Sequence, residues 1–292
     1  MENRRFPEAP KLGNKNRFSL GRLHLFELED QSWFPRVIPD AGTDFMRFVA
    51  EVAKSYGTVV ARLERALGTT GSQEILDLCS GGAGPVMAIR DALAAGGNQV
   101  PVTLTDKFPN RAAFEYAKRR SDGGVSFIGV SIDATAVPSD LPGFRTLFCG
   151  LHHFRPDAAR RILQNAVDQR RPIGVFEITQ RNLVYIVGSL LLPLALFLST
   201  PFIRPFRWGR LFWTYVILVV PAFLTWDAFV SCLRTYSPKE LRELLDGLNC
   251  EGYAWDIGVE ADRLVSIFYL IGYPNRRAAG RRGAVPLVCR GW

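Results

Sequence analysis

The sequence is poor in cysteine, and no two of its cysteines are spaced as a pair. Its five cysteines, spread over 292 residues, form no C-x-x-C motif, which argues against a disulfide framework and against a cysteine-based zinc site. No apolar stretch follows the basic residues at the start of the chain, so no signal peptide is expected. These absences predict a reducing location, facing the cytoplasm.

Positive charge is concentrated at the two ends of the chain and is scarce in the middle. The formal net charge is +8, yet residues 275–292 hold five arginines and no acid, and residues 1–22 hold six basic against two acidic side chains. The near-neutral middle lacks the basic groove that nucleic-acid binding requires, so no nucleic-acid partner is expected. The basic ends suit an anionic membrane surface, and solvated, disordered ends are an equally good interpretation.

Three glycines fall within four positions of one short stretch, residues 74–85, with the sequence EILDLCSGGAGP. A buried strand over 75–78 is expected to give way to a tight turn and then to a helix over 86–93. Without side chains, the turn would let a ligand lie against bare N–H groups at the N-terminus of a helix. Three glycines make up the turn: Gly81, Gly82 and Gly84.

The turn does not match the dinucleotide pattern G-x-G-x-x-G, because Met87 stands at its last position. Asp77, just before the turn, would repel a pyrophosphate but attract a cationic amino group. The stretch resembles motif I of the class I S-adenosylmethionine (SAM)-dependent methyltransferases, in the L-D-L-C-S-G-G-x-G-P version of some bacterial members. Cys79 stands where the commoner motif has glycine. The resemblance implies an α/β fold with a doubly wound sheet of seven strands, and SAM as the cofactor.

The resemblance also implies cofactor contacts at the ends of three predicted strands, over 75–78, 100–106 and 125–133. Asp77 is expected to hold the methionine amine, Asp106 the ribose and Asp133 the adenine, since the ends of parallel strands share one edge of a sheet. A dinucleotide fold also places an acid near Asp106, so this residue alone leaves an NAD-dependent oxidoreductase open. The other implied cofactor-binding residues are Cys79, Ser80, Gly81, Gly82, Gly84, Lys107, Ala134 and Gly150.

Two adjacent histidines, His152 and His153, follow the predicted fourth strand (146–149), where the family often has catalytic residues. One of them could act as a general base near neutral pH, or both could be structural. No third ligand lies at a suggestive spacing, so no metal is predicted. The remaining expected substrate contacts are Trp33, Phe34, Phe154, Glu177 and Tyr236. For Trp33 and Phe34, packing of an N-terminal cap onto the core is the competing interpretation.

Two long apolar runs interrupt the second half of the chain. Residues 183–203 contain no charge over 21 positions, about 32 Å if helical, and residues 211–226 add 16 uncharged positions. Prolines at 193, 201 and 221 are expected to kink or break these helices. The connector carries Arg204, Arg207 and Arg210, which a spanning hairpin would place against the positive-inside tendency. We therefore favour a hairpin embedded in one leaflet with its arginines on lipid phosphates, over a spanning hairpin, a lid or a dimer interface.

These patterns predict six segments. They are a disordered basic N-terminus (1–22), a helical cap (23–70), a SAM-binding core (71–180), a membrane-associated helical hairpin (181–233), the end of the core (234–274) and a basic tail (275–292). Helices are expected over 44–67, 157–169 and 237–248, and further strands over 172–178, 250–259 and 263–273.

The predicted function is transfer of a methyl group from SAM to a small lipophilic acceptor, through an O-, S- or C-nucleophile, at the cytoplasmic face of a membrane. A non-catalytic SAM-binding membrane scaffold and an oxidoreductase are the alternatives. The Asn/Asp-Pro-Pro-aromatic loop used on nucleic-acid bases is missing from the expected site. The oligomeric state stays open, and the hairpin could mediate a homo-oligomer.

Overall fold

A seven-stranded sheet forms the centre of the molecule. The computed structural model describes residues 21–261 and 265–275, and its strand order is β3-β2-β1-β4-β5-β7-β6. Strands β1 to β5 are parallel to one another, whereas β7 is antiparallel to both β5 and β6. This confirms the predicted α/β sheet of seven strands. The strands are β1 (Ile75–Asp77), β2 (Val102–Leu104), β3 (Val125–Phe127), β4 (Phe144–Phe148), β5 (Ile173–Glu177), β6 (Tyr253–Ala261) and β7 (Ser266–Pro274).

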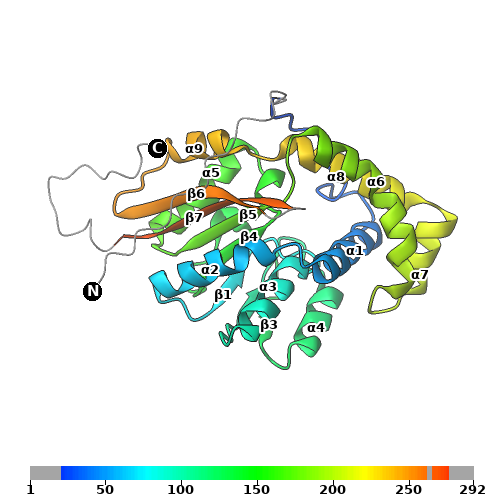
Figure 1. Ribbon diagram of the computed structural model, residues 1–292, viewed down its shortest axis with the longest axis horizontal. Helices are drawn as coiled ribbons and strands as arrows, with labels where there is room; N and C mark the ends of the chain where they lie inside the picture. Colours follow the sequence, from blue (N-terminus) through cyan, green and yellow to red (C-terminus); the bar gives the residue numbers. More distant parts are fainter. Residues whose placement is uncertain (1–20, 262–264, 276–292) are drawn as a thin grey trace.

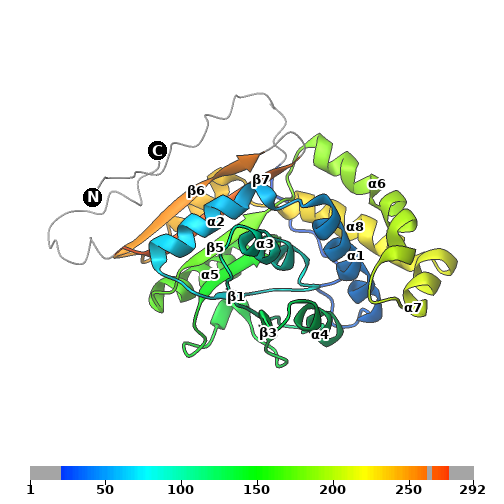
Figure 2. The same cartoon turned by 60° about the horizontal axis from the view of Figure 1, so that its bottom comes forward.

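Helices cover both faces of the sheet, as Figures 1 and 2 show. On one face, α2 (Gly57–Thr70), α3 (Gly84–Ala95) and α4 (Arg111–Arg120) share an apolar cluster with Phe144 and Phe148 of β4. On the other face, α5 (Pro156–Asp168) and α9 (Pro238–Leu245) pack with Leu147 of the same strand. Because side chains alternate along a strand, one buried strand supplies both cores.

The N-terminal cap consists of two helices, α1 (Val37–Ala53) and α2, where the sequence predicted one over 44–67. Lys54 ends α1 in the left-handed conformation. The break lets Tyr56 point into the core, where its ring meets Phe148 edge-on at 5.5 Å and its hydroxyl lies 3.0 Å from Cys149 Sγ. The prediction of a single helix was wrong because the chain breaks after α1, and this break allows Tyr56 to be buried in the core.

The apolar runs form an insertion that lies beside α1 at one end of the molecule (Figures 1 and 2). It contains α6 (Leu183–Ser199), a 3₁₀ turn (Thr200–Phe202), α7 (Trp208–Leu211), a π-helical turn (Phe212–Val216) and α8 (Val219–Arg234). Within the described residues, the helical stretch Leu183–Phe202 is long and apolar enough to cross a membrane, and only 17% of its apolar window is buried. The 208–216 and 219–234 helices meet at 79°.

One prediction about the insertion holds only in part, and another was wrong. The helix α6 continues through Pro193, and Pro221 lies in the first turn of α8, where proline is tolerated, but α6 does end at Ser199, just before Pro201. Arg210 is buried rather than placed for lipid phosphates: its guanidinium lies 2.7 Å from Asp44 Oδ2. Arg207 lies 3.7 Å from the same oxygen. The physical reason is Asp44 on α1, which is 0% exposed and needs nearby cations.

The predictions for residues 1–20, 262–264 and 276–292, which include most of both basic ends, lie outside the described residues.

Candidate active site

Asp77 ends β1 in a fully buried position. Its Oδ1 accepts a hydrogen bond from the Thr146 hydroxyl at 2.5 Å. Burial is the main cause that raises the pKa of Asp77 to about 7, and the nearby Asp106 adds to it. The carboxyl group is therefore close to half-protonated near neutral pH, and a cationic ligand group beside it would favour the ionised form.

Asp106 and Asp133 lie at the same edge of the sheet, and backbone groups hold both. Asp106 accepts from the N–H groups of Gly81 at 2.9 Å and Phe108 at 2.8 Å. Asp133 accepts from Thr135 N at 2.8 Å, and hydrogen bonds help to lower its pKa against the effect of burial. The two segments meet where Ile132 N donates to Asp106 O at 2.9 Å. The three acids therefore lie at one edge, as the sequence predicted.

One detail of this prediction was wrong. The strand expected over 125–133 ends at Phe127, and Asp133 instead caps a 3₁₀ turn, Ala134–Ala136. Ala134, the first residue of that turn, is buried, and Lys107 Nζ lies 3.2 Å from Asp133 Oδ2.

The glycine turn is covered by α1, which gives two of its glycines a packing role. A Cβ at Gly82 would lie 2.6 Å from Thr43 O, and one at Gly84 would lie 2.4 Å from Arg47 Cα. Only Gly81 is open, at φ +49°, with its nearest neighbour 3.7 Å away. The expectation that all three glycines clear space for a ligand is therefore wrong for Gly82 and Gly84, which admit the backbone of α1.

Three other predicted cofactor residues support the turn. Cys79 adopts φ +55°, a left-handed conformation that favours glycine, which agrees with the glycine of the commoner motif. Burial raises the pKa of its thiol well above the usual range. The Ser80 hydroxyl donates to Asp77 O at 3.0 Å. A Cβ at Gly150 would lie 3.3 Å from Cys79 Cβ, so this glycine allows the loop after β4 to approach the turn.

His152 and Glu177 form a buried pair beside this edge. His152 lies in a 3₁₀ turn, Leu151–His153, and its Nδ1 is 2.7 Å from Glu177 Oε2. The other carboxylate oxygen of Glu177 accepts from Leu151 N at 2.8 Å. Glu177 thus fixes the orientation of the imidazole and leaves Nε2 as its second nitrogen. Because Glu177 is fully engaged here, a contact with substrate stays a prediction.

His153 is surrounded by acids that the sequence analysis did not select. Its Nδ1 lies 2.6 Å from Glu27 Oε2 and 3.2 Å from Asp30 Oδ1, and its Nε2 lies 3.1 Å from Glu29 Oε1. Burial opposes the change, but Glu27 and Asp30 raise the pKa of His153 well above the usual range. A raised pKa favours the protonated imidazole, which argues against His153 as a general base. The one available signal was the acidic Glu27-x-Glu29-Asp30 run.

The N-terminal segment, residues 21–36, crosses the site and carries Glu27, Glu29 and Asp30 to His153. Arg22 Nη2 donates to Phe154 O at 2.9 Å, and its guanidinium lies 3.9 Å above the Tyr236 ring. The carboxylate of Asp227, on α8, accepts from the N–H groups of Leu28 and Glu29. Phe154 and Tyr236 thus lie close to the histidines but beneath this segment.

Two predicted substrate residues lie elsewhere. The Phe34 ring packs against Phe223 of α8 at 5.6 Å, and Trp33, which is 68% exposed, packs edge-on against Phe34. This placement supports their competing interpretation as residues that fasten the cap.

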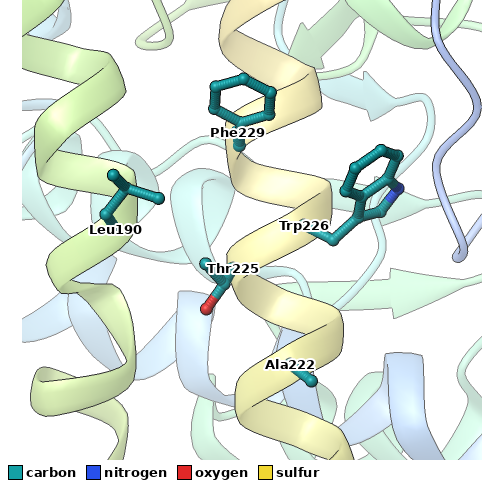
Figure 3. Close-up of a pocket in the computed structure, with 5 residues that line it drawn as sticks. All are labelled: Leu190, Ala222, Thr225, Trp226 and Phe229. Atoms are coloured by element: carbon teal, nitrogen blue, oxygen red, sulfur yellow. The ribbon is translucent and has the colours of Figure 1, made fainter.

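An apolar groove of about 470 Å³ lies between α6 and α8 (Figure 3). Trp226 forms one side of it, and its Nε1 donates to Phe26 O in the N-terminal segment at 3.1 Å. The groove therefore lies next to the segment that crosses the histidines. Its lining residues are Leu190, Ala222, Thr225, Trp226 and Phe229.

No protein-family model and no curated protein matches the chain. Solved structures that resemble it include the O-methyltransferase NcsB1 from neocarzinostatin biosynthesis, in complex with S-adenosylmethionine (16% identity, TM-score 0.47, 78% of this chain and 55% of that one). Another is the plantazolicin methyltransferase BpumL in complex with SAH (12%, TM-score 0.47, 82% and 96%). A third is the pyocyanin biosynthetic protein PhzM (15%, TM-score 0.46, 77% and 56%).

The chain spans about 55% of the length of the first structures it matches. The assignment of the fold rests on the order and direction of the strands themselves.

Proposed function

We propose that this protein is a SAM-dependent methyltransferase acting on a small lipophilic acceptor at the cytoplasmic face of a membrane. The observation that carries the proposal is the convergence of Asp77, Asp106 and Asp133 at one sheet edge, beside a glycine turn. Ligands of open α/β sheets bind at this edge. A ligand that carries an amine, a ribose and an adenine supplies a hydrogen-bond donor for each acid.

The residues present fit this cofactor in their chemistry. Gly81 is open and its N–H orients the Asp106 carboxylate, which has lone pairs left for two ribose hydroxyls. Asp77, held by Thr146, is the acid that we propose for the amine. When bound, SAM supplies an electrophilic methyl group. The protein's task is then to align the acceptor and to exclude water, and His152, oriented by Glu177, is the histidine that we propose as a general base.

The lipophilic acceptor and the membrane are supported by the insertion. Apolar side chains along α6 are exposed, among them Leu191 and Leu194, each 62% exposed. The apolar groove between α6 and α8 is open to the same region. We propose that α6 lies in the interface of one leaflet and that the groove accepts the apolar part of the substrate.

The catalytic proposal is tested with methyl-labelled SAM and an organic-soluble extract of the host. We expect label to enter the organic phase and Asp106→Asn to lower the transfer at least 100-fold. The matched control is Asp122→Asn, an exposed acid in the turn before β3 whose φ of +48° suits asparagine. SAM binding without transfer would favour the scaffold instead, and NAD(H) binding without SAM binding would favour the oxidoreductase.

The membrane proposal is tested by flotation with anionic lipid vesicles. Burying one leucine contributes about 1.5–3 kcal/mol, so Leu191→Glu with Leu194→Glu is expected to abolish flotation and leave the stability unchanged. The control is Val52→Glu on α1, an apolar residue with a similar exposure of 67%. Equal flotation of both variants would contradict an interfacial α6.

A further inference from the structure

The N-terminal segment and the turn after β4 together build a cluster of metal-ligand type. Glu27, His152 and His153 each offer one ligand atom, and these three atoms lie within 4.8 Å of one another. The sequence argued against a metal because no third ligand is near the histidines along the chain. The fold supplies that ligand from more than a hundred residues away.

Each histidine in the cluster is oriented by a carboxylate behind it. His152 Nδ1 lies 2.7 Å from Glu177, and His153 Nε2 lies 3.1 Å from Glu29. The second nitrogen of His152 is Nε2, and the second nitrogen of His153, Nδ1, faces Glu27 Oε2 at 2.6 Å and Asp30 Oδ1 at 3.2 Å. In metal sites, a histidine ligand almost always gives its second nitrogen to a carboxylate or carbonyl in this way, which fixes the ring and strengthens the ligand.

The inner atoms of the cluster lack hydrogen bonds. Glu27 is 0% exposed, and within residues 21–261 and 265–275 neither Glu27 Oε2 nor His153 Nδ1 makes a hydrogen bond of acceptable geometry, although they lie 2.6 Å apart. Arg234 Nη1 approaches Glu27 Oε2 at 2.8 Å, again without such geometry. Glu27 Oε2 is therefore held by the nearby His153 and Arg234 without hydrogen bonds of good geometry, and a metal ion between Glu27 and His153 would coordinate it directly.

The local charges also leave room for a divalent cation. Four carboxylates surround the two imidazoles, and Arg234 is the guanidinium in contact with Glu27 and Asp30. The four are Glu27, Glu29, Asp30 and Glu177.

We propose that Glu27, His152 and His153 bind a zinc-type divalent metal ion. Two histidines and one glutamate are a common set for zinc and leave its fourth position open. The ion takes the place of the proton between Glu27 and His153, and their ligand atoms separate from 2.6 Å to the spacing of about 3.3 Å that two ligands at 2.0–2.1 Å require. That proton leaves for the solvent.

The open fourth coordination position would allow the ion to bind the methyl acceptor at this edge of the sheet. Coordinated to zinc, an oxygen or sulfur of the acceptor loses its proton more readily, as water does, so the acceptor would reach the methyl donor as a nucleophile. This use rests on the proposed methyltransferase function. The binding of the ion does not, and it is therefore measured without SAM.

The test uses the whole chain, stripped of metal, in titrations with Zn²⁺ against a chromophoric chelator and with Co²⁺ followed by visible absorption. We expect one equivalent of Zn²⁺ per chain and the absorption of a four- or five-coordinate Co²⁺ site. Glu27→Gln and His153→Gln should each weaken binding about 100-fold or more, and Glu177→Gln about 10- to 100-fold. The matched control is His24→Gln, the third histidine of the chain, which contacts Arg22 outside the cluster and should bind normally.

Two results would overturn the proposal. One is a wild-type chain that takes up no metal at micromolar free Zn²⁺, a result that does not depend on the folding of any variant. The other is uptake that folded Glu27→Gln and His153→Gln chains retain in full, since the ion would then lie elsewhere. Loss of methyl transfer with intact zinc binding would count against the proposed function alone.

Discussion

Replacing Gly84 with alanine tests whether the glycine turn is shaped by α1 or by a ligand. The added Cβ would lie 2.4 Å from Arg47 Cα and 2.9 Å from Arg47 Cβ, whereas two carbon atoms in good contact are about 3.5–4.0 Å apart. The obstacle includes backbone, so no side-chain rotation relieves it and α1 must move. Overpacking of this kind costs about 1–3 kcal/mol, and the better helix propensity of alanine offsets less than about 1 kcal/mol.

We therefore expect Gly84→Ala to lower the free energy of unfolding by about 2 kcal/mol, or the midpoint temperature by about 4–8 °C. Thermal and urea-induced unfolding without ligand measure this directly. The control is Gly68→Ala in α2, where nothing lies within 4 Å of the added Cβ and alanine should stabilise by about 0.5–1 kcal/mol. If Gly84→Ala unfolds like the wild type and loses only SAM affinity, the packing argument is wrong.

Three further changes have defined outcomes. Asp44→Asn removes the carboxylate that lies 2.7 Å from the buried Arg210, so urea-induced unfolding should show a loss of about 3–5 kcal/mol; a loss below about 1 kcal/mol would contradict a buried ion pair. Because the pKa of Asp77 rises from 3.8 to about 7 on folding, its contribution is present at low pH and is lost as the pH rises from about 4 to 7. Relative to Asp77→Asn, the wild type should lose up to about 1.4 kcal/mol per pH unit in that window, and parallel stability–pH curves would refute this. Ser237→Ala removes the capping box with Glu240 and should cost about 1 kcal/mol in thermal unfolding, whereas an unchanged midpoint would count against the cap.

The strands of the sheet could be predicted because each one is indicated by residues that are neighbours in the sequence. Each parallel strand is a short apolar run that ends near a turn or an acid, and the Ser237–Glu240 capping box marks the start of α9 within four residues. The same locality explains why the acids of the candidate site were found. Asp77 ends β1 and Asp106 lies two residues beyond the end of β2, so the topology alone brings them together.

Four of the discrepancies involve partners that are distant in the sequence. Nothing near Arg210 indicates that Asp44 lies against it, and nothing near His153 indicates Glu27. Periodicity could not show that Tyr56 leaves the helix to reach Cys149. The roles of Gly82 and Gly84 were missed for the same reason, since a close approach by α1 and a close approach by a ligand require the same residue type.

The helix α1 is shared by two regions that the sequence treats as separate. Its residues Thr43 and Arg47 press on the glycine turn, while Asp44, between them, holds the arginine of the insertion. A shift of the insertion that carried Asp44 along would therefore reach the sheet edge that holds Asp77, Asp106 and Asp133. By thermodynamic linkage, if a lipid surface changes the affinity for a ligand at that edge through α1, the ligand changes the affinity for lipid by the same factor. Vesicle binding would then report on the occupancy of a site that the vesicle never touches.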